Sequence, residues 1–199
     1  MVGNNHLVLR ADDIRPFILP DHPGYQSHHI LGSETAGVHD TLLNQGTLEV
    51  QRGLSITNTS RTFDSAAGAL NVSSGQILTV NGGVTSLGSG TTFAGSGTLK
   101  IAGPALDLAS NLTLPGSGGV VLDLNGTSAV TVSSGTSGTD LILPATGSLT
   151  LSNDTIASSV DLLNSGTVTV SGSGLTSAIN GGLTNAVTTG TIRVQSSGS

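Results

Sequence analysis

A short phrase is written three times in this chain and constrains its fold more than any other feature. It combines apolar residues, an asparagine, a glycine and a threonine, and reads LLNQGTLEV at 42–50, LLNSGTVTV at 162–170 and LTNAVTTGTIRV at 183–194. A looser form, a glycine followed by alternating apolar residues, recurs at Gly75, Gly97 and Gly147. Repetition at this scale is typical of a chain that stacks one small structural unit.

Apolar and polar residues alternate over short runs throughout the repeated region, as in LDL at 106–108 and VTV at 168–170. This period of two predicts short strands with one side inward and the other toward water. Gly, Asn, Ser and Pro between the runs supply turns, and no stretch sustains the spacing of an amphipathic helix. The sequence therefore predicts an all-β fold.

The spacing of the glycine-led phrase distinguishes between all-β architectures. From Gly46 to Gly190, with one copy missing between Gly97 and Gly147, it returns about every 24 residues, and each step holds about three alternating runs. This predicts a right-handed parallel β-solenoid of about six rungs of about 24 residues. A β-sandwich, the alternative, has longer strands and a thicker core, which the 2% aromatic content does not favour. In a solenoid, the asparagines of the phrase are expected to form inward or corner ladders: Asn44, Asn164 and Asn185.

Composition divides the chain near residue 41. All five histidines and the single tyrosine precede that point, whereas Gly, Ser, Thr, Asn and small aliphatic residues dominate after it. We predict an irregular N-terminal leader or cap over 1–41 and a β-solenoid repeat body over 42–199.

The charge content excludes several functions. Only 9% of the residues are charged and the net charge is −6, so no basic stripe exists for nucleic-acid binding. The sequence has no window of 18 apolar residues, so we expect no membrane insertion. There is no cysteine for a disulfide or thiolate site, and the first 30 residues lack the apolar core of a signal peptide. We expect no cofactor.

Histidines gather in the predicted leader and are ligand types that zinc or nickel accepts. The candidates are His22, His28, His29 and His39. Their spacing matches no recognised metal motif and prolines and glycines flank them, so we predict surface histidines rather than a metal site. A second motif, LPATG at 143–147, spells a sortase signal but lies inside the repeats, where it serves as a turn into a strand.

Carboxylates of the repeat body raise the question of catalysis, because paired acids hydrolyse glycosidic bonds. Asp107, Asp123 and Asp161 are each the middle residue of an alternating run, so they are expected to point outward and to align on one face. Outward charge also discourages stacking between sheets. We predict that these aspartates keep the surface soluble and that the protein is not an enzyme.

The phrases LLNSGTVTV, GSGTLKI and GSLTL resemble those of repetitive bacterial surface proteins, namely autotransporter passengers and filamentous-haemagglutinin-like adhesins. The resemblance covers 42–194 and assigns no functional residue. It implies a non-enzymatic, extracellular or cell-surface module with a structural or adhesive role, and a host or cell-surface ligand as partner. Two alternatives remain: a trimeric phage tail-fibre or tailspike segment in a virion, and a polysaccharide-degrading β-helix enzyme.

The last rung of the predicted solenoid lacks a polar cap, because SSGS at 196–199 directly follows a strand. An uncovered rung exposes unpaired backbone groups. We therefore expect either a longer parent chain or end-to-end self-association into a fibre. In the second case the leader would donate a strand to a neighbour by β-augmentation, with the segment His6, Leu7, Val8, Leu9 and Arg10.

Overall fold

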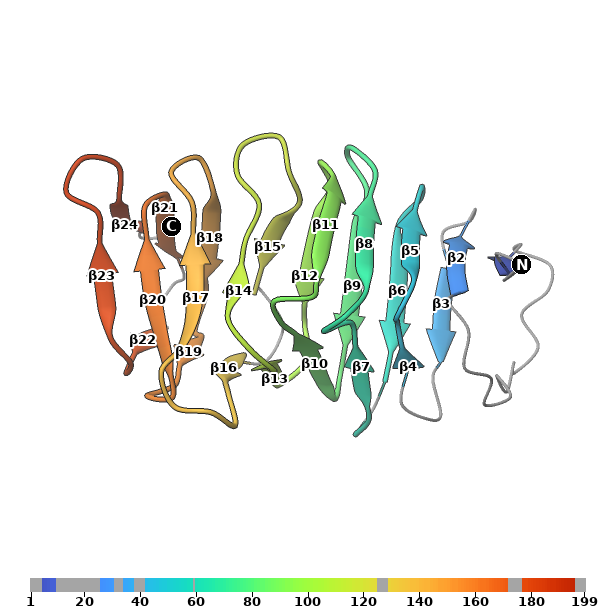
Figure 1. The fold of residues 1–199 in the computed structure, drawn as a ribbon, viewed down its shortest axis with the longest axis horizontal. Coiled ribbons are helices and arrows are strands. Elements are labelled where there is room, and N and C mark those ends of the chain that lie inside the picture. The colour runs from blue at the N-terminus through green and yellow to red at the C-terminus, as the bar shows by residue number, and fades with distance from the viewer. Residues whose placement is uncertain are drawn as a thin grey trace.

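The protein is a parallel β-solenoid of about seven turns with a spacing of about 22 residues (Figure 1). A computed structural model describes residues 42–58, 60–124, 129–171 and 177–195, together with the backbone of 5–9, 26–30 and 34–37. The predicted fold class is confirmed, with one turn more than expected and a slightly shorter spacing. No helix occurs among the described residues.

Three sides enclose the interior, and from Gln26 onward the described strands follow one another on the first, second and third sides in that order. The first side consists of two separate sheets. One sheet contains β1 (Asn5–Leu9), β2 (Gln26–Ile30), β5 (Thr47–Val50), β8 (Ala69–Val72) and β11 (Thr92–Gly95). The other contains β14 (Leu112–Thr113), β17 (Thr139–Leu143), β20 (Val160–Asn164) and β23 (Leu183–Asn185).

The second and third sides are each one continuous sheet, and all described pairings are parallel. The second side contains β3 (Glu34–Gly37), β6 (Leu54–Thr57), β9 (Ile77–Asn81), β12 (Thr98–Ile101), β15 (Val121–Asp123), β18 (Ser148–Leu151), β21 (Thr167–Ser171) and β24 (Thr191–Gln195). The third contains β4 (Leu42–Leu43), β7 (Thr62–Asp64), β10 (Val84–Leu87), β13 (Ala105–Leu108), β16 (Thr131–Ser133), β19 (Thr155–Ile156) and β22 (Ala178–Ile179).

Alternation in the sequence produces the core. In β12, Leu99 and Ile101 are fully buried while Thr98 and Lys100 are partly exposed. In-register pairing stacks each inward residue on its counterpart one turn away, so Leu99 lies between Leu78 and Leu122. Each buried aliphatic side chain contributes up to about 1.5–3 kcal/mol. Continuous rows of such residues hold successive turns together.

The three copies of the repeated phrase do not occupy equivalent places. LLNQGTLEV joins β4 to β5, a corner between the third and first sides, whereas LLNSGTVTV joins β20 to β21, between the first and second sides. The third copy, which joins β23 to β24, matches the second. Gly166 directly precedes β21 on the second side. The glycine that directly precedes β6 on the same side is Gly53, and not Gly46. Counting from Gly46 makes the first step, from 46 to 75, 29 residues long and so raises the mean spacing. The number of turns was too small because β2 and β3 lie ahead of residue 42.

The asparagine ladder is confirmed for two of its three expected members. Asn164 and Asn185 are in register, and the Asn164 Nδ2 donates to Asn185 Oδ1 at 2.6 Å. Asn44 is also buried, but it lies at the other kind of corner, where its Nδ2 donates to Ser65 Oγ at 2.9 Å. Asn44 thus takes a buried corner position as expected, but it bonds to a serine and not to another asparagine, because the first phrase lies on a different corner.

Strands β1, β2 and β3 fall inside the segment predicted as an irregular leader. Strand β2 pairs with β5 and β3 pairs with β6, so at these residues the sheets extend ahead of residue 42. The remainder of 1–41 lies outside the described residues, and the division at residue 41 stays a prediction.

The glycine-led phrase lacks a copy between Gly97 and Gly147. Strand β15 takes this place in the second side, where Val121 N–H donates to Gly97 O at 3.0 Å.

Candidate functional site

The first side is interrupted between β11 and β14, and this break is the main irregularity of the solenoid. No backbone hydrogen bond joins the two strands, although the second and third sides continue without interruption across the same turns. The corner that leads into β14 has three residues, 109–111, whereas the corners of the turns before and after have four (88–91) and five (134–138). A short corner between two longer ones leaves a notch.

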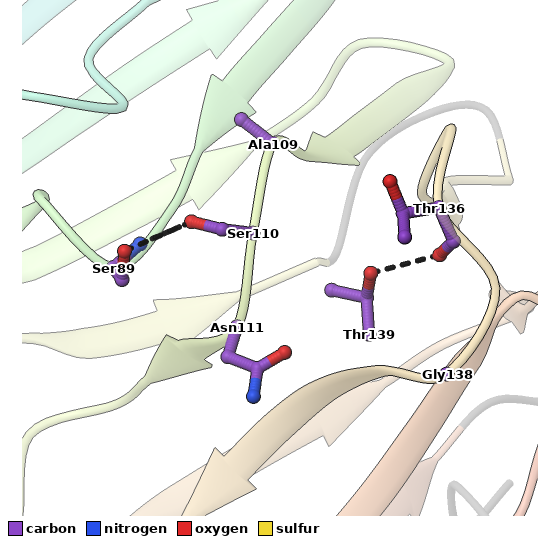
Figure 2. A pocket seen from close by; sticks show the side chains of 7 residues that line it. All are labelled: Ser89, Ala109, Ser110, Asn111, Thr136, Gly138 and Thr139. Carbon is purple, nitrogen blue, oxygen red and sulfur yellow. Dashed lines mark hydrogen bonds between the residues drawn. The ribbon is translucent and has the colours of Figure 1, made fainter.

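This notch is a hollow of about 400 Å³. Small and polar residues line it (Figure 2): Ser89, Ala109, Ser110, Asn111, Thr136, Gly138 and Thr139. The Ser110 hydroxyl accepts from Ser89 N–H at 2.8 Å and donates to Ser89 Oγ at 3.0 Å, while Thr139 Oγ1 donates to Thr136 O at 2.8 Å. None of the lining side chains is charged, so the hollow itself suits neutral, hydrogen-bonding groups.

A carboxylate lies beside the hollow and is held by one of its lining residues. Asn111 Nδ2 donates to Asp140 Oδ2 at 3.0 Å, and Asp140 N–H donates back to Asn111 Oδ1 at 3.0 Å. In the next turn Asp161 is in register with Asp140, and its Oδ1 accepts from Gly182 N–H at 2.6 Å. The first side therefore presents two adjacent carboxylates close to the break.

The aspartates weighed for catalysis lie on three different sides. Asp107 is in β13 on the third side, Asp123 in β15 on the second and Asp161 in β20 on the first. Each alternates with buried neighbours, which agrees with an outward position. Their expected alignment on one face is wrong, because the side that each triplet occupies depends on turn lengths. Asp107 and Asp123 do not form a pair across a shared groove.

Asp154 is a buried carboxylate that sequence reasoning did not single out. It is fully buried at the corner before β19, where Oδ1 accepts from Val130 N–H at 2.9 Å and Oδ2 from Ser152 N–H at 2.6 Å. Burial raises its pKa above the usual range, Asp123 raises it further, and the two backbone hydrogen bonds act in the opposite direction. The side chain connects neighbouring turns at their corners and is closed to a substrate.

The raised pKa of Asp154 predicts a dependence of stability on pH. A carboxyl group whose pKa is higher in the folded state lowers the free energy of unfolding when it ionises. This destabilisation should disappear as pH falls from neutral through the raised pKa toward the usual range of an aspartate. We expect the thermal midpoint of the wild type to rise on acidification relative to that of Asp154→Asn, which does not titrate at this position. Thermal melts of both proteins from pH 7.5 to 4.5 measure the difference. A difference that is constant with pH would contradict this prediction.

The candidate histidines lie in the part of the chain whose side chains are not described. His28 and His29 belong to β2, in register with Leu48 and Glu49, whereas His22 and His39 lie outside the described residues. Among the described side chains no group of three or more His, Asp or Glu residues is placed to hold a metal ion. The interpretation of these histidines as surface residues therefore stays a prediction.

The candidate assembly segment forms a strand in its own chain. Residues 6–9 belong to β1, which pairs in parallel with β2, and Arg10 lies outside the described residues. Donation of this strand to a neighbour stays a prediction.

The LPATG motif forms the turn between β17 and β18, as expected, with Gly147 N–H donating to Pro144 O at 2.8 Å.

No protein-family model, curated protein or solved structure matches the chain. Among the described residues, no helix is long and apolar enough to cross a membrane.

Large apolar side chains are exposed chiefly in the last described turn. Leu183, Ile192 and Val194 are 45%, 42% and 79% exposed. Their counterparts one turn earlier are more buried: Leu162 and Val168 fully, and Val170 partly. Val187, between β23 and β24, is fully exposed. Within the described residues no strand pairs with the outer edge of β23 or β24. The core rows thus end at an open face.

Proposed function

We propose that this protein is a non-enzymatic structural rod, displayed outside the cell, that associates end to end with copies of itself. The exposed core rows of the last turn carry this proposal. Ile192 and Val194 continue the inward rows of the second side, and 42% and 79% of their surfaces are exposed in the described structure. Burying these residues and pairing the edges of β23 and β24 would extend the same interactions that join turns within the chain.

The distribution of charge favours contacts along the axis over contacts between sides. Outward charged residues occur on every side of the solenoid, with Asp140 on the first, Lys100 on the second and Asp107 on the third. Outward charge discourages a flat sheet from stacking on another. The resemblance to bacterial surface repeats supports the extracellular or cell-surface location and an adhesive role toward a host or cell-surface ligand.

A single charge in the open face tests this proposal. Val194→Asp is expected to weaken self-association by at least about tenfold, because an unpaired carboxylate is costly to bury. Thr191→Asp is the matched control: it adds the same charge to the same strand at a position in the outward row of Thr167. Sedimentation velocity over a concentration series and negative-stain microscopy measure association.

We expect concentration-dependent filaments for the wild type and the control, and monomers for Val194→Asp. A wild type that stays monomeric at all concentrations would refute end-to-end association. A trimer of fixed mass that Val194→Asp leaves intact would also refute it, and would favour the alternative of a phage tail-fibre segment.

A further inference from the structure

The unpaired edge of β11 at the break is a template for one more strand. Thr92 N–H donates to Gly68 O of the preceding turn at 3.1 Å. Because successive residues of a strand direct their backbone groups to opposite edges, the N–H and C=O of Phe93 point toward the following turn. There β14 has only two residues and does not pair with β11. Unpaired edges of this kind accept an extended peptide.

The hollow lies at the N-terminal ends of the two strands that flank the break. Ser89 lies in the corner before β11, and Asn111 directly precedes β14 (Figure 2). The corner 109–111 lies between the corners of Ser89 and Thr136 and bonds to both neighbouring turns. Beyond this corner, three of the four residues of β11 are exposed, which agrees with an uncovered edge. A strand parallel to β11 would begin in the hollow.

Side chains at the break define the chemistry of the segment. Phe93 is only partly buried, whereas Leu70, which is in register with it in the preceding turn, is fully buried. A small apolar residue would cover the exposed part of its ring. Asp140, held by Asn111 beside the hollow, supplies negative charge, and no lining residue supplies positive charge. A cation at the N-terminal end of the segment complements this arrangement.

We propose that the break binds an extended peptide segment of a partner protein as an added strand parallel to β11. Alternate residues of the segment are small and apolar and cover Phe93. A lysine or arginine at its N-terminal end lies next to Asp140. This interaction is separate from end-to-end association, because it uses the middle of the solenoid and not the last turn.

Two peptides of identical composition test both the site and the direction of binding. The first reads Lys-Thr-Val-Thr-Val-Thr-Gln and the second reads Gln-Thr-Val-Thr-Val-Thr-Lys, each with blocked termini and a fluorescent label. Fluorescence anisotropy with the full chain measures affinity. We expect the first peptide to bind about threefold more tightly, the size of effect that a partly exposed charge pair produces. Asp140→Asn should remove this preference, and Asp107→Asn, on the third side, should retain it.

A bulky substitution tests whether the hollow is the entrance. Thr136 is exposed on the wall of the hollow, so Thr136→Trp should fill the space without disturbing the core. We expect this variant to lose most of its affinity for the first peptide while its thermal midpoint stays unchanged. Absence of binding to the wild type at millimolar peptide, or equal binding to wild type and Thr136→Trp, would overturn the proposal.

Discussion

Replacing Phe63 by alanine is expected to lower the free energy of unfolding by about 3–5 kcal/mol. Phe63 is fully buried in β7 and is the largest of the fully buried side chains. It lies in register with Leu42 on one side and Thr85 on the other. The ladders on both sides of β7 hold these neighbours at the strand spacing, so they cannot move far enough to fill the cavity. Urea denaturation followed by circular dichroism measures the change.

Phe93→Ala is the matched control, because it removes the same atoms from a partly exposed ring at the break. Less apolar surface returns to water there, and solvent fills part of the space. We expect a clearly smaller loss of stability than for Phe63→Ala. Equal losses for the two variants would contradict the view that the interior beside β7 is more closely packed than the core at the break.

The all-β fold and the stacked turns were predictable because they depend on local patterns. Alternation within a run such as Thr98 to Ile101 already decides which side chains face the interior. Narrow interiors need small aliphatic residues, and the sequence supplies these in every turn. Inward and outward positions of Asp107, Asp123 and Asp161 follow from the same alternation, and the structure agrees with them.

The phase of the turns was not predictable from the repeated phrase. An asparagine followed by a glycine suits any corner where the chain changes direction, because the amide satisfies backbone groups and the glycine leaves room. Asn44 and Asn164 perform this task at different corners, as the bonds from Asn44 Nδ2 to Ala69 O and from Asn164 Nδ2 to Thr191 O show. The phrase therefore identifies a corner without identifying the sides that it joins.

The break and its hollow were not predictable either. They arise because a corner of three residues lies between longer ones and because pairing fails between β11 and β14. Ser89, Ser110 and Thr136 are ordinary turn residues, and 21 to 47 residues of chain separate them. Only the stacking of turns brings them together, so no local motif could have indicated the site.

Gly166→Ala is expected to lower the free energy of unfolding by about 1–3 kcal/mol, through overpacking rather than through lost burial. Gly166 is the glycine of LLNSGTVTV, and a Cβ atom at this position would meet the carbonyl oxygens of Gly147 and Pro144 in the preceding turn. Both oxygens belong to backbone. The Gly147 oxygen also accepts from Thr167 N–H at 3.0 Å. Relief of the clash therefore requires the two turns to separate and weakens this hydrogen bond.

Gly135→Ala separates this steric effect from the general effect of replacing a glycine. Gly135 lies in the corner between β16 and β17, and a Cβ atom there would have nothing within 4 Å. We expect a change within about 0.5 kcal/mol. Chemical denaturation of both variants measures the contrast. If Gly166→Ala were as neutral as Gly135→Ala, the glycines of the phrase would not be required for close approach of the turns, and their recurrence would need another cause.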